Sequence, residues 1–257
     1  MKFLLIAGCF VLGLLVGSFL NVVIYRVPRH ESIVRPRSAC PHCGSQIRER
    51  DNIPVFSWLA LKGRCRNCHA PISARYPLVE LGNALLFAAT AAQIGFNWEL
   101  PAFLTLSAGL LALACIDLER LVLPKVIVYL TLALVAGLLV LDAVVTGQWH
   151  RLLIALIFCV GWFVVFFLLN AIQPRLLGFG DVRLALVLGL ALGWLGWKYV
   201  VLGFFSANFI GAIIGIWLIG TKRIGRDQPI PYGLFLAIGT IFAVLCGHNI
   251  VNHFQTL

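Results

Sequence analysis

The sequence predicts an all-α polytopic membrane protein with about eight transmembrane helices and one small polar domain between the first two. Of its 257 residues, 61% are hydrophobic and only 12% are charged, whereas an ordinary soluble domain carries about 25% charged residues. Apolar stretches long enough to cross a bilayer, which takes roughly 20 residues, recur along the chain. The basic residues gather in a few loops. We therefore expect lipid to be the solvent for most of the chain.

Polar residues divide the apolar sequence into eight predicted spans. They cover residues 3–25, 77–96, 100–118, 121–141, 151–173, 182–197, 199–220 and 230–248. The sixth is the weakest, because it is short, starts with Arg183 and is separated from the seventh only by a Trp and a Lys, so a re-entrant or tilted segment would also fit. The first begins like a signal peptide, but its apolar run exceeds the usual 7–15 residues and no small-x-small cleavage site follows. We expect it to be retained as a span.

The loop charges predict the orientation of the chain. With the N-terminus outside, the inside loops hold 17 of the 20 Lys and Arg residues, as the positive-inside rule requires. Ten of them lie between residues 26 and 75, and the others are Arg120, Lys125, Arg175, Arg183, Lys222, Arg223 and Arg226. The outside residues are Lys2, Arg151 and Lys198. Residues 26–76 are therefore expected in the cytoplasm and the tail, residues 248–257, outside.

The net charge of +10 bears on the partners of the chain. On a soluble protein such a charge would suggest nucleic acid. Here the charge is confined to loops beside apolar spans, which suits an anionic membrane surface better. We expect membrane lipid as a partner and no nucleic acid.

Four of the eight cysteines lie in the polar region between the first two spans. Cys40 and Cys43 form one Cys-x-x-Cys pair, and 21 residues later Cys65 and Cys68 form another. Two such knuckles at this spacing predict a four-sulfur zinc site. Because four thiolates would close the coordination sphere, we expect structural rather than catalytic zinc.

Other interpretations of these cysteines stay open at this stage. Two disulfides or free thiols are the alternatives, although a reducing cytoplasm disfavours disulfides. His42 and His69 could replace a sulfur ligand, and the charges of Arg64 and Arg66 would favour thiolate over thiol. The remaining cysteines are expected within apolar spans, and they are Cys9, Cys115, Cys159 and Cys246.

Two aspartates are placed to act together. Asp117 closes the third predicted span and Asp181 opens the sixth, so both are expected at cytoplasmic helix ends and at similar depth. Paired carboxylates can hydrolyse a peptide bond, because one accepts a proton from water while the other, protonated, polarises the carbonyl. Gly178 and Gly180 would let an extended substrate strand approach closely. The pattern predicts an aspartic protease in the membrane.

Each aspartate also has a simpler interpretation. Asp117 could pair with Arg120, and Asp181 could cap a helix that begins at Val182. Glu80, near the start of the second predicted span, stays open between packing and function. The remaining acids compete poorly for a catalytic role, and those considered are Glu119, Asp142 and Asp227. At the level of the whole protein, a zinc-stabilised transporter or channel and a non-catalytic secretion-system scaffold are the alternatives, although no chain of acids crosses the bilayer as an ion path would require.

The motifs resemble those of the type IV prepilin peptidase family, membrane proteins with a Gly-x-Gly-Asp aspartic site. The resemblance covers almost the whole chain. The matching segments are residues 17–29, 37–43, 51–59, 63–68, 72–80, 178–181 and 229–233.

The resemblance implies a substrate and a second activity. Asp117 and Asp181 would be the catalytic pair, supported by Gly178 and Gly180. The substrates would be prepilins of type IV pili and pseudopilins of type II secretion, cut after a glycine between a basic cytoplasmic leader and an apolar stem. The new first residue, usually Phe, would then be N-methylated from S-adenosylmethionine. The protein would lie in the bacterial inner membrane.

The same resemblance gives a division into domains and leaves some residues unassigned. Residues 1–25 would be the first span, 26–76 a methyltransferase-associated zinc domain, and 77–257 the helical peptidase domain. The chain has no Gly-x-Gly-x-x-Gly loop after a strand, so no residue is assigned to S-adenosylmethionine. It departs from the family at Leu123-Pro124-Lys125, where Ile-Pro-Asp is frequent, and at Leu234, where Pro is common.

Overall fold

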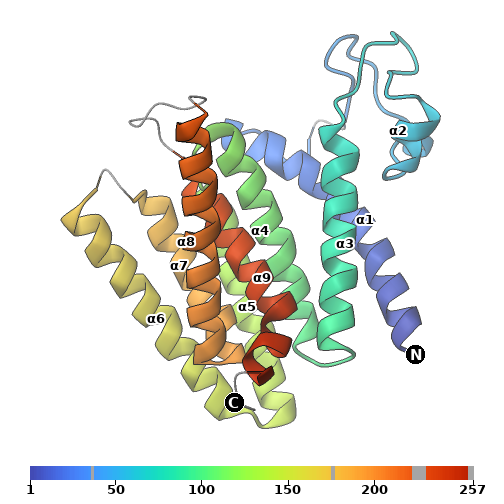
Figure 1. The fold of residues 1–257 in the computed structure, drawn as a ribbon. Helices are drawn as coiled ribbons and strands as arrows, with labels where there is room; N and C mark the ends of the chain where they lie inside the picture. The colour runs from blue at the N-terminus through green and yellow to red at the C-terminus, as the bar shows by residue number, and fades with distance from the viewer. Residues whose placement is uncertain (36–37, 175–176, 222–229, 254–257) are drawn as a thin grey trace. The chain divides into compact units, whose positions relative to one another are not determined.

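The computed structural model describes residues 1–35, 38–174, 177–221 and 230–253, and within these ranges the regular structure is helical. The helices are α1 (Lys2–Arg26), α2 (Phe56–Ala60), α3 (Arg75–Ile94), α4 (Leu100–Arg120), α5 (Lys125–Thr146), α6 (Trp149–Ile172), α7 (Phe179–Leu195), α8 (Trp197–Gly220) and α9 (Tyr232–His253), shown in Figure 1. Two 3-10 turns complete the set, Val27–Arg29 and Glu49–Asp51. The chain forms two compact units, Met1–Phe96 and Asn97–Leu257.

Seven of the described helices are long and apolar enough to cross a membrane, namely α1, α3, α4, α5, α6, α8 and α9. The eighth long helix, α7, has 17 residues and corresponds to the predicted sixth span. The predicted all-α, multi-pass fold class is confirmed, and the span singled out as weakest is the short one.

Two predicted spans have wrong boundaries, and one of them is the eighth, which was expected to end at residue 248 although α9 continues to His253. The fourth span was expected at residues 121–141, but α5 begins at Lys125 and runs to Thr146. Leu121 ends α4 in a left-handed conformation with φ 54°, and the extended Pro124 precedes α5. Residues 121–124 are apolar but form a loop, which hydropathy alone does not distinguish from a span. Five basic residues predicted inside, at 37, 175, 222, 223 and 226, lie outside the described residues, as do the first residues of the 37–43 and 229–233 motifs.

Within the first unit, α1 and α3 pack closely along small residues. A Cβ added to Gly13 would lie 2.6 Å from the Ala84 Cα, and one added to Gly17 would lie 2.7 Å from the Glu80 Cα. The buried Asn83 side chain donates a hydrogen bond of 2.8 Å to the Gly13 carbonyl. Small residues and interhelical polar contacts are what hold helices together in lipid, where burial of apolar surface contributes little. The polar segment between the two helices carries the four clustered cysteines.

Within the second unit, α7 is enclosed by its neighbours. It packs against α5, α6, α8 and α9, and 12 of its 17 residues are buried. Gly189 and Gly193 bring α7 against the backbone of α6, so that a Cβ on Gly189 would lie 2.3 Å from the Phe158 carbonyl oxygen. By contrast, α6 buries only three of its 24 residues within the unit and presents the rest to the surroundings. The short helix is therefore a core element, and the long helices shield it.

A polar cluster fixes one end of α7. Trp194 donates a hydrogen bond of 2.7 Å from Nε1 to Glu99 Oε2, which also pairs with Arg151 at 3.0 Å. Arg151 in turn donates a 3.1 Å hydrogen bond to the Trp194 carbonyl. The cluster joins the start of α4, the start of α6 and the end of α7, at the end of the unit opposite Asp117 and Asp181.

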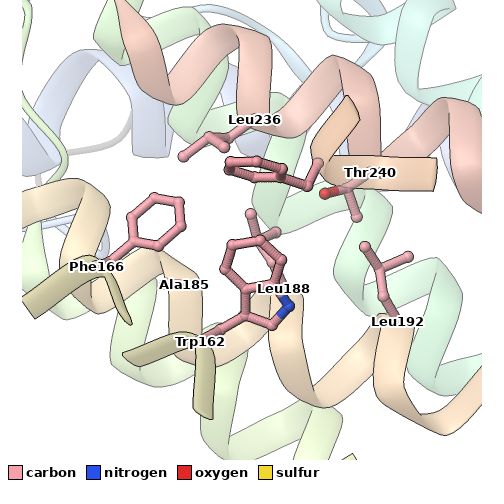
Figure 2. A pocket seen from close by; sticks show the side chains of 9 residues that line it. Trp162, Phe166, Ala185, Leu188, Leu192, Leu236 and Thr240 are labelled. Atoms are coloured by element: carbon pink, nitrogen blue, oxygen red, sulfur yellow. The ribbon is translucent and has the colours of Figure 1, made fainter. Parts of the chain in front are cut away.

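An apolar cavity of about 20 Å³ lies among α6, α7, α8 and α9. Figure 2 shows Trp162 and Phe166 of α6 facing Leu188 of α7 and Leu236 and Thr240 of α9. The volume is about that of one water molecule. We interpret the cavity as a packing gap rather than a ligand site.

The close packing of α6 and α7 leads to a stability prediction. Gly189→Ala should destabilise the protein by about 1–3 kcal/mol, because the new methyl group would collide with the backbone of α6. The matched control is Gly161→Ala on α6, where a Cβ meets nothing within 4 Å. The measurement is thermal unfolding of both purified variants in the same detergent. Equal midpoints for the two variants would contradict the described packing.

Candidate active site and metal centre

Three helix ends of the second unit meet around Asp117. Asp117 lies in the last turn of α4 and is 5% exposed. The backbone N–H of Leu234, in the first turn of α9, donates a hydrogen bond of 3.0 Å to Asp117 Oδ2, and the backbone of Gly233 provides a second one. A helix N-terminus carries unpaired N–H groups and partial positive charge, so it is a favourable neighbour for a carboxylate.

Asp181 comes to the same place from α7. It is 8% exposed, and its carboxylate interacts electrostatically with Asp117. The helix begins at Phe179 with the extended Gly178 as its N-cap, so Asp181 is the third helical residue. The helix therefore does not begin at Val182, as the capping interpretation assumed, but the Asp181 carboxylate accepts hydrogen bonds from the backbone of Gly178 and of Asp181 itself and so also stabilises the start of α7. The structure brings together the two aspartates that the sequence singled out.

The interpretation of Asp117 as a partner of Arg120 is also unsupported. Asp117 is buried and its Oδ2 is turned toward the first turn of α9, whereas Arg120 is exposed at the end of α4. The burial of both carboxylates leaves little water to screen them. Two like charges in such a place do not ionise together, so the pair is expected to share a proton.

Two glycines allow this approach of helix ends. A Cβ added to Gly180 would lie 3.0 Å from the Leu123 Cβ, and one added to Gly233 would lie 2.9 Å from Leu123 Cδ1 and 3.0 Å from Asp117 Oδ2. Gly178 is less constrained, since its nearest neighbour would be Asp181 Oδ2 at 3.2 Å. Of the two predicted supporting glycines, Gly180 is the one against which the Leu123 side chain packs closely.

Sequence reasoning missed several residues of this site. Gly233, Leu234 and Leu123 were noticed only as parts of family motifs, where the departures at Leu123 and Leu234 were expected to alter substrate preference, and no contact of these residues with the aspartates was inferred. Tyr232 was also missed. Its hydroxyl donates a hydrogen bond of 3.2 Å to Asn208 Oδ1 on α8, and it interacts electrostatically with Asp181. The available signal was a glycine directly after Tyr232 at the start of an apolar helix.

The other acids of interest have local partners. Glu80, on α3 in the first unit, is 8% exposed and accepts a 2.7 Å hydrogen bond from the backbone N–H of Val55. Val55 has φ 62°, a strained conformation for a β-branched residue, so this bond stabilises the loop and favours a packing role for Glu80. Asp142 on α5 accepts a bond from its own helix, from the Thr146 hydroxyl at 3.0 Å. Asp227 lies outside the described residues.

The four cysteine sulfurs of the first unit converge, with all of them within 4.8 Å of one another. A tetrahedral zinc site with Zn–S bonds of about 2.3 Å has sulfur–sulfur edges of about 3.8 Å, and Cys40 Sγ and Cys68 Sγ are 3.8 Å apart. The group therefore has the composition and spacing that a metal ion would need. His42 and His69 are not members of it.

The two knuckles have the same backbone geometry. In each, the first cysteine accepts a hydrogen bond from the N–H four residues later, Gly44 to Cys40 at 2.9 Å and His69 to Cys65 at 3.0 Å. Gly44 and His69 both have positive φ, 69° and 56°. The two Cys-x-x-Cys turns therefore have equivalent backbone conformations.

Hydrogen bonds at the knuckles act on the thiols. Bonds from the Ser45 side chain and backbone lower the pKa of Cys43 to about 6, and backbone bonds from Cys68 and Asn67 lower the pKa of Cys65. The predicted influence of Arg66 is not the main one, because its guanidinium pairs with Asp51 at 2.6 Å. Thiolates are the form that binds metal.

Comparisons with known proteins agree with the division of the chain into the two compact units Met1–Phe96 and Asn97–Leu257. The model of the bacterial peptidase A24 N-terminal domain matches residues 11–94, and that of the type IV leader peptidase family matches residues 104–216. A Pseudomonas aeruginosa protein is 37% identical over 94% of this chain and 90% of its own length. The chain belongs to the type IV leader peptidase family.

Other relatives place the chain in the same family. An Aeromonas hydrophila protein is 37% identical over 96% of this chain and 92% of its own length. A Myxococcus xanthus protein is 44% identical over 86% of this chain and 67% of its own. These relatives, like that of Pseudomonas aeruginosa, are named prepilin leader peptidase/N-methyltransferase. No solved structure matches the chain.

The cysteine cluster leads to a metal prediction for this leader peptidase family member. The purified full-length protein should carry about one zinc ion per chain, and Cys40→Ser should remove most of it, because three sulfurs bind more weakly than four. The measurement is metal analysis by mass spectrometry. Cys246→Ser on α9, outside the cluster, is the control and should retain the metal. A wild-type protein free of metal would defeat the assignment.

Proposed function

We propose that this protein cleaves the basic leader from type IV prepilins and pseudopilins, and then N-methylates the new first residue. One observation carries the cleavage half: two buried aspartates, from α4 and α7, meet beside the N-terminus of α9. Relatives named prepilin leader peptidase/N-methyltransferase support both halves. The family relationship does not favour a transporter or a scaffold.

The proposed chemistry uses the pair as one acid and one base. The ionised carboxylate removes a proton from a water molecule as the water oxygen attacks the scissile carbonyl carbon. The protonated carboxyl donates its hydrogen to the carbonyl oxygen, which gives a neutral tetrahedral intermediate. The C–N bond then breaks, the amine leaves with the proton taken from water, and one hydroxyl of the intermediate returns its proton to the carboxylate that had donated it. The leader departs with a new carboxyl group, and the pair is regenerated. Asp117 and Asp181 supply both groups, and the roles belong to the pair.

The arrangement of helix ends supports a reaction that takes place at a single membrane face. The end of α4 and the starts of α7 and α9 lie together. This is expected if α5 crosses the membrane and α6 crosses back, and if α7 and α8 do the same. We propose that this face is cytoplasmic and that the membrane is the bacterial inner membrane. The concentration of Lys and Arg in the loops of that side supports the orientation. A prepilin would reach this face with its leader in water and its stem in lipid.

The first unit is proposed to contribute to methylation. Its four sulfurs would hold a structural zinc ion that stabilises a segment too small to have a large core of its own. S-adenosylmethionine, when bound, would supply an electrophilic methyl group for the new terminal amine. The departures from the family at Leu123–Lys125 and Leu234 spare both aspartates and would act on substrate preference.

The pair of Asp117 and Asp181, called the dyad from here on, predicts a specific loss of function. Asp117→Asn and Asp181→Asn should each lower leader cleavage by at least about 100-fold, because each removes half of an acid–base pair. The measurement is cleavage of a prepilin peptide in membranes containing the full-length variant. Both variants should still methylate a leaderless peptide with labelled S-adenosylmethionine, which shows that they are folded.

The matched control is Asp142→Asn, a buried aspartate at the other end of α5 that should cleave normally. Normal cleavage by either dyad variant would refute the peptidase half. Failure of every variant, and of the wild type, to methylate the leaderless peptide would refute the methyltransferase half alone.

A further inference from the structure

The short helix α2 in the polar segment of the first unit turns its polar side inward and its apolar side outward. Ser57 is buried, and its hydroxyl accepts a 2.9 Å hydrogen bond from the Ile53 N–H and donates one of 3.1 Å to the Arg50 carbonyl. Phe56 and Leu59 of α2 are 67% and 58% exposed, and Ile53, just before it, is 52% exposed. A helix surrounded by water is expected to show the opposite arrangement. These three exposed side chains form an apolar patch that water alone does not explain.

The apolar patch lies beside the start of a helix that can cross the membrane. The backbone N–H of Val55, directly before Phe56, donates a hydrogen bond of 2.7 Å to Glu80 Oε2. Glu80 is the sixth residue of α3, which begins at Arg75, so it lies about 7.5 Å along that helix. Because α2 follows Val55 directly, it lies level with the first turns of α3 (Figure 1). The headgroup layer, about 5–7 Å thick, is expected at this depth.

Contacts inside the unit hold α2 in this orientation. Trp58 donates a hydrogen bond of 3.0 Å from Nε1 to the Ile72 carbonyl, a few residues before α3. On the other side, the bond from Val55 to Glu80 holds the start of α2, although Val55 has the strained φ of 62°. The inner side of α2 is thus fixed to the region around α3, and the apolar patch is left on the outer side.

Basic side chains surround the apolar patch. Arg50 and Arg66 line a hollow of about 120 Å³ together with two members of the patch. Lys62 follows the other end of α2 and is exposed. Residues 47–66 contain five basic and two acidic residues, and one of the acids, Asp51, pairs with Arg66 at 2.6 Å. The surroundings of the patch therefore carry a net positive charge.

We propose that the apolar patch enters the membrane interface beside α3, and that Arg50 and Lys62 bind the head groups of anionic phospholipids there. Apolar side chains within a basic rim are typical of segments that lie in the headgroup layer. Anionic lipid attracts basic residues next to a spanning helix within about 10 Å of the surface. Residues 27–74 join two such helices, so the segment cannot leave the membrane surface. The proposal concerns anchoring of this segment and does not rest on leader cleavage.

The test is photocrosslinking of the full-length protein in vesicles of roughly one part phosphatidylglycerol to three parts phosphatidylcholine. The photoreactive residue benzoylphenylalanine replaces Phe56 or, as the matched control, Gln46, an exposed polar residue of the same segment. We expect lipid adducts, measured by mass spectrometry, to be at least about fivefold more frequent at position 56. Leu59→benzoylphenylalanine serves as the test if the variant at position 56 does not fold.

A second measurement in the same vesicles tests the charge. Phosphatidylglycerol should be enriched about threefold among the adducts at position 56, relative to its share of the vesicle lipid. Adding Arg50→Gln and Lys62→Gln to that variant should lower its frequency to the share in the vesicle, because the basic rim is then weakened.

Three results would overturn the proposal. The first is a lack of lipid adducts at positions 56 and 59, or equal frequencies at positions 56 and 46. The second is adducts with protein at position 56, because a second copy, the second unit or a substrate stem would then cover the patch. The third is phosphatidylglycerol at its vesicle share before the two basic residues are replaced.

Discussion

The close contact of Leu123 with two glycines is the constraint on which the proposed site depends. Gly180 and Gly233 let the starts of α7 and α9 approach the loop after α4, and a Cβ at either position would lie 3.0 Å or less from Leu123. This approach brings the Leu234 N–H to Asp117 and brings Asp181 within electrostatic reach of it. A side chain at either glycine position would press on Leu123, so we expect it to disturb the approach of the two carboxylates that the proposed chemistry needs together.

The rest of the second unit makes this contact possible. The helix that carries Asp181 is short and enclosed, and its far end is tied to α4 and α6 by the Glu99, Arg151 and Trp194 cluster. Along its length Gly189 brings it against α6. Asp181 is thus held on a buried core helix, as the proposed catalytic pair would require for preorganisation.

Much of the fold and part of the site could be predicted from the sequence. Hydropathy identified the eight long helices, and spacing identified the four sulfurs that converge. Asp117 and Asp181 were found because charges are rare in this chain. The loop at residues 121–124 was missed because it is as apolar as a span, and Gly233 and Leu123 were missed because their importance lies in contacts between distant segments. Such contacts leave no local pattern in a sequence.

The most direct test of the account is a rescue experiment at the contact between Gly180 and Leu123. Gly180→Ala should lower kcat/KM for leader cleavage at least about tenfold, since its methyl group would displace Leu123. The double variant Gly180→Ala, Leu123→Ala should recover much of that loss, because the space is then free. Independent, multiplicative effects of the two substitutions, with no recovery, would contradict the account, since residues in contact are expected to be coupled.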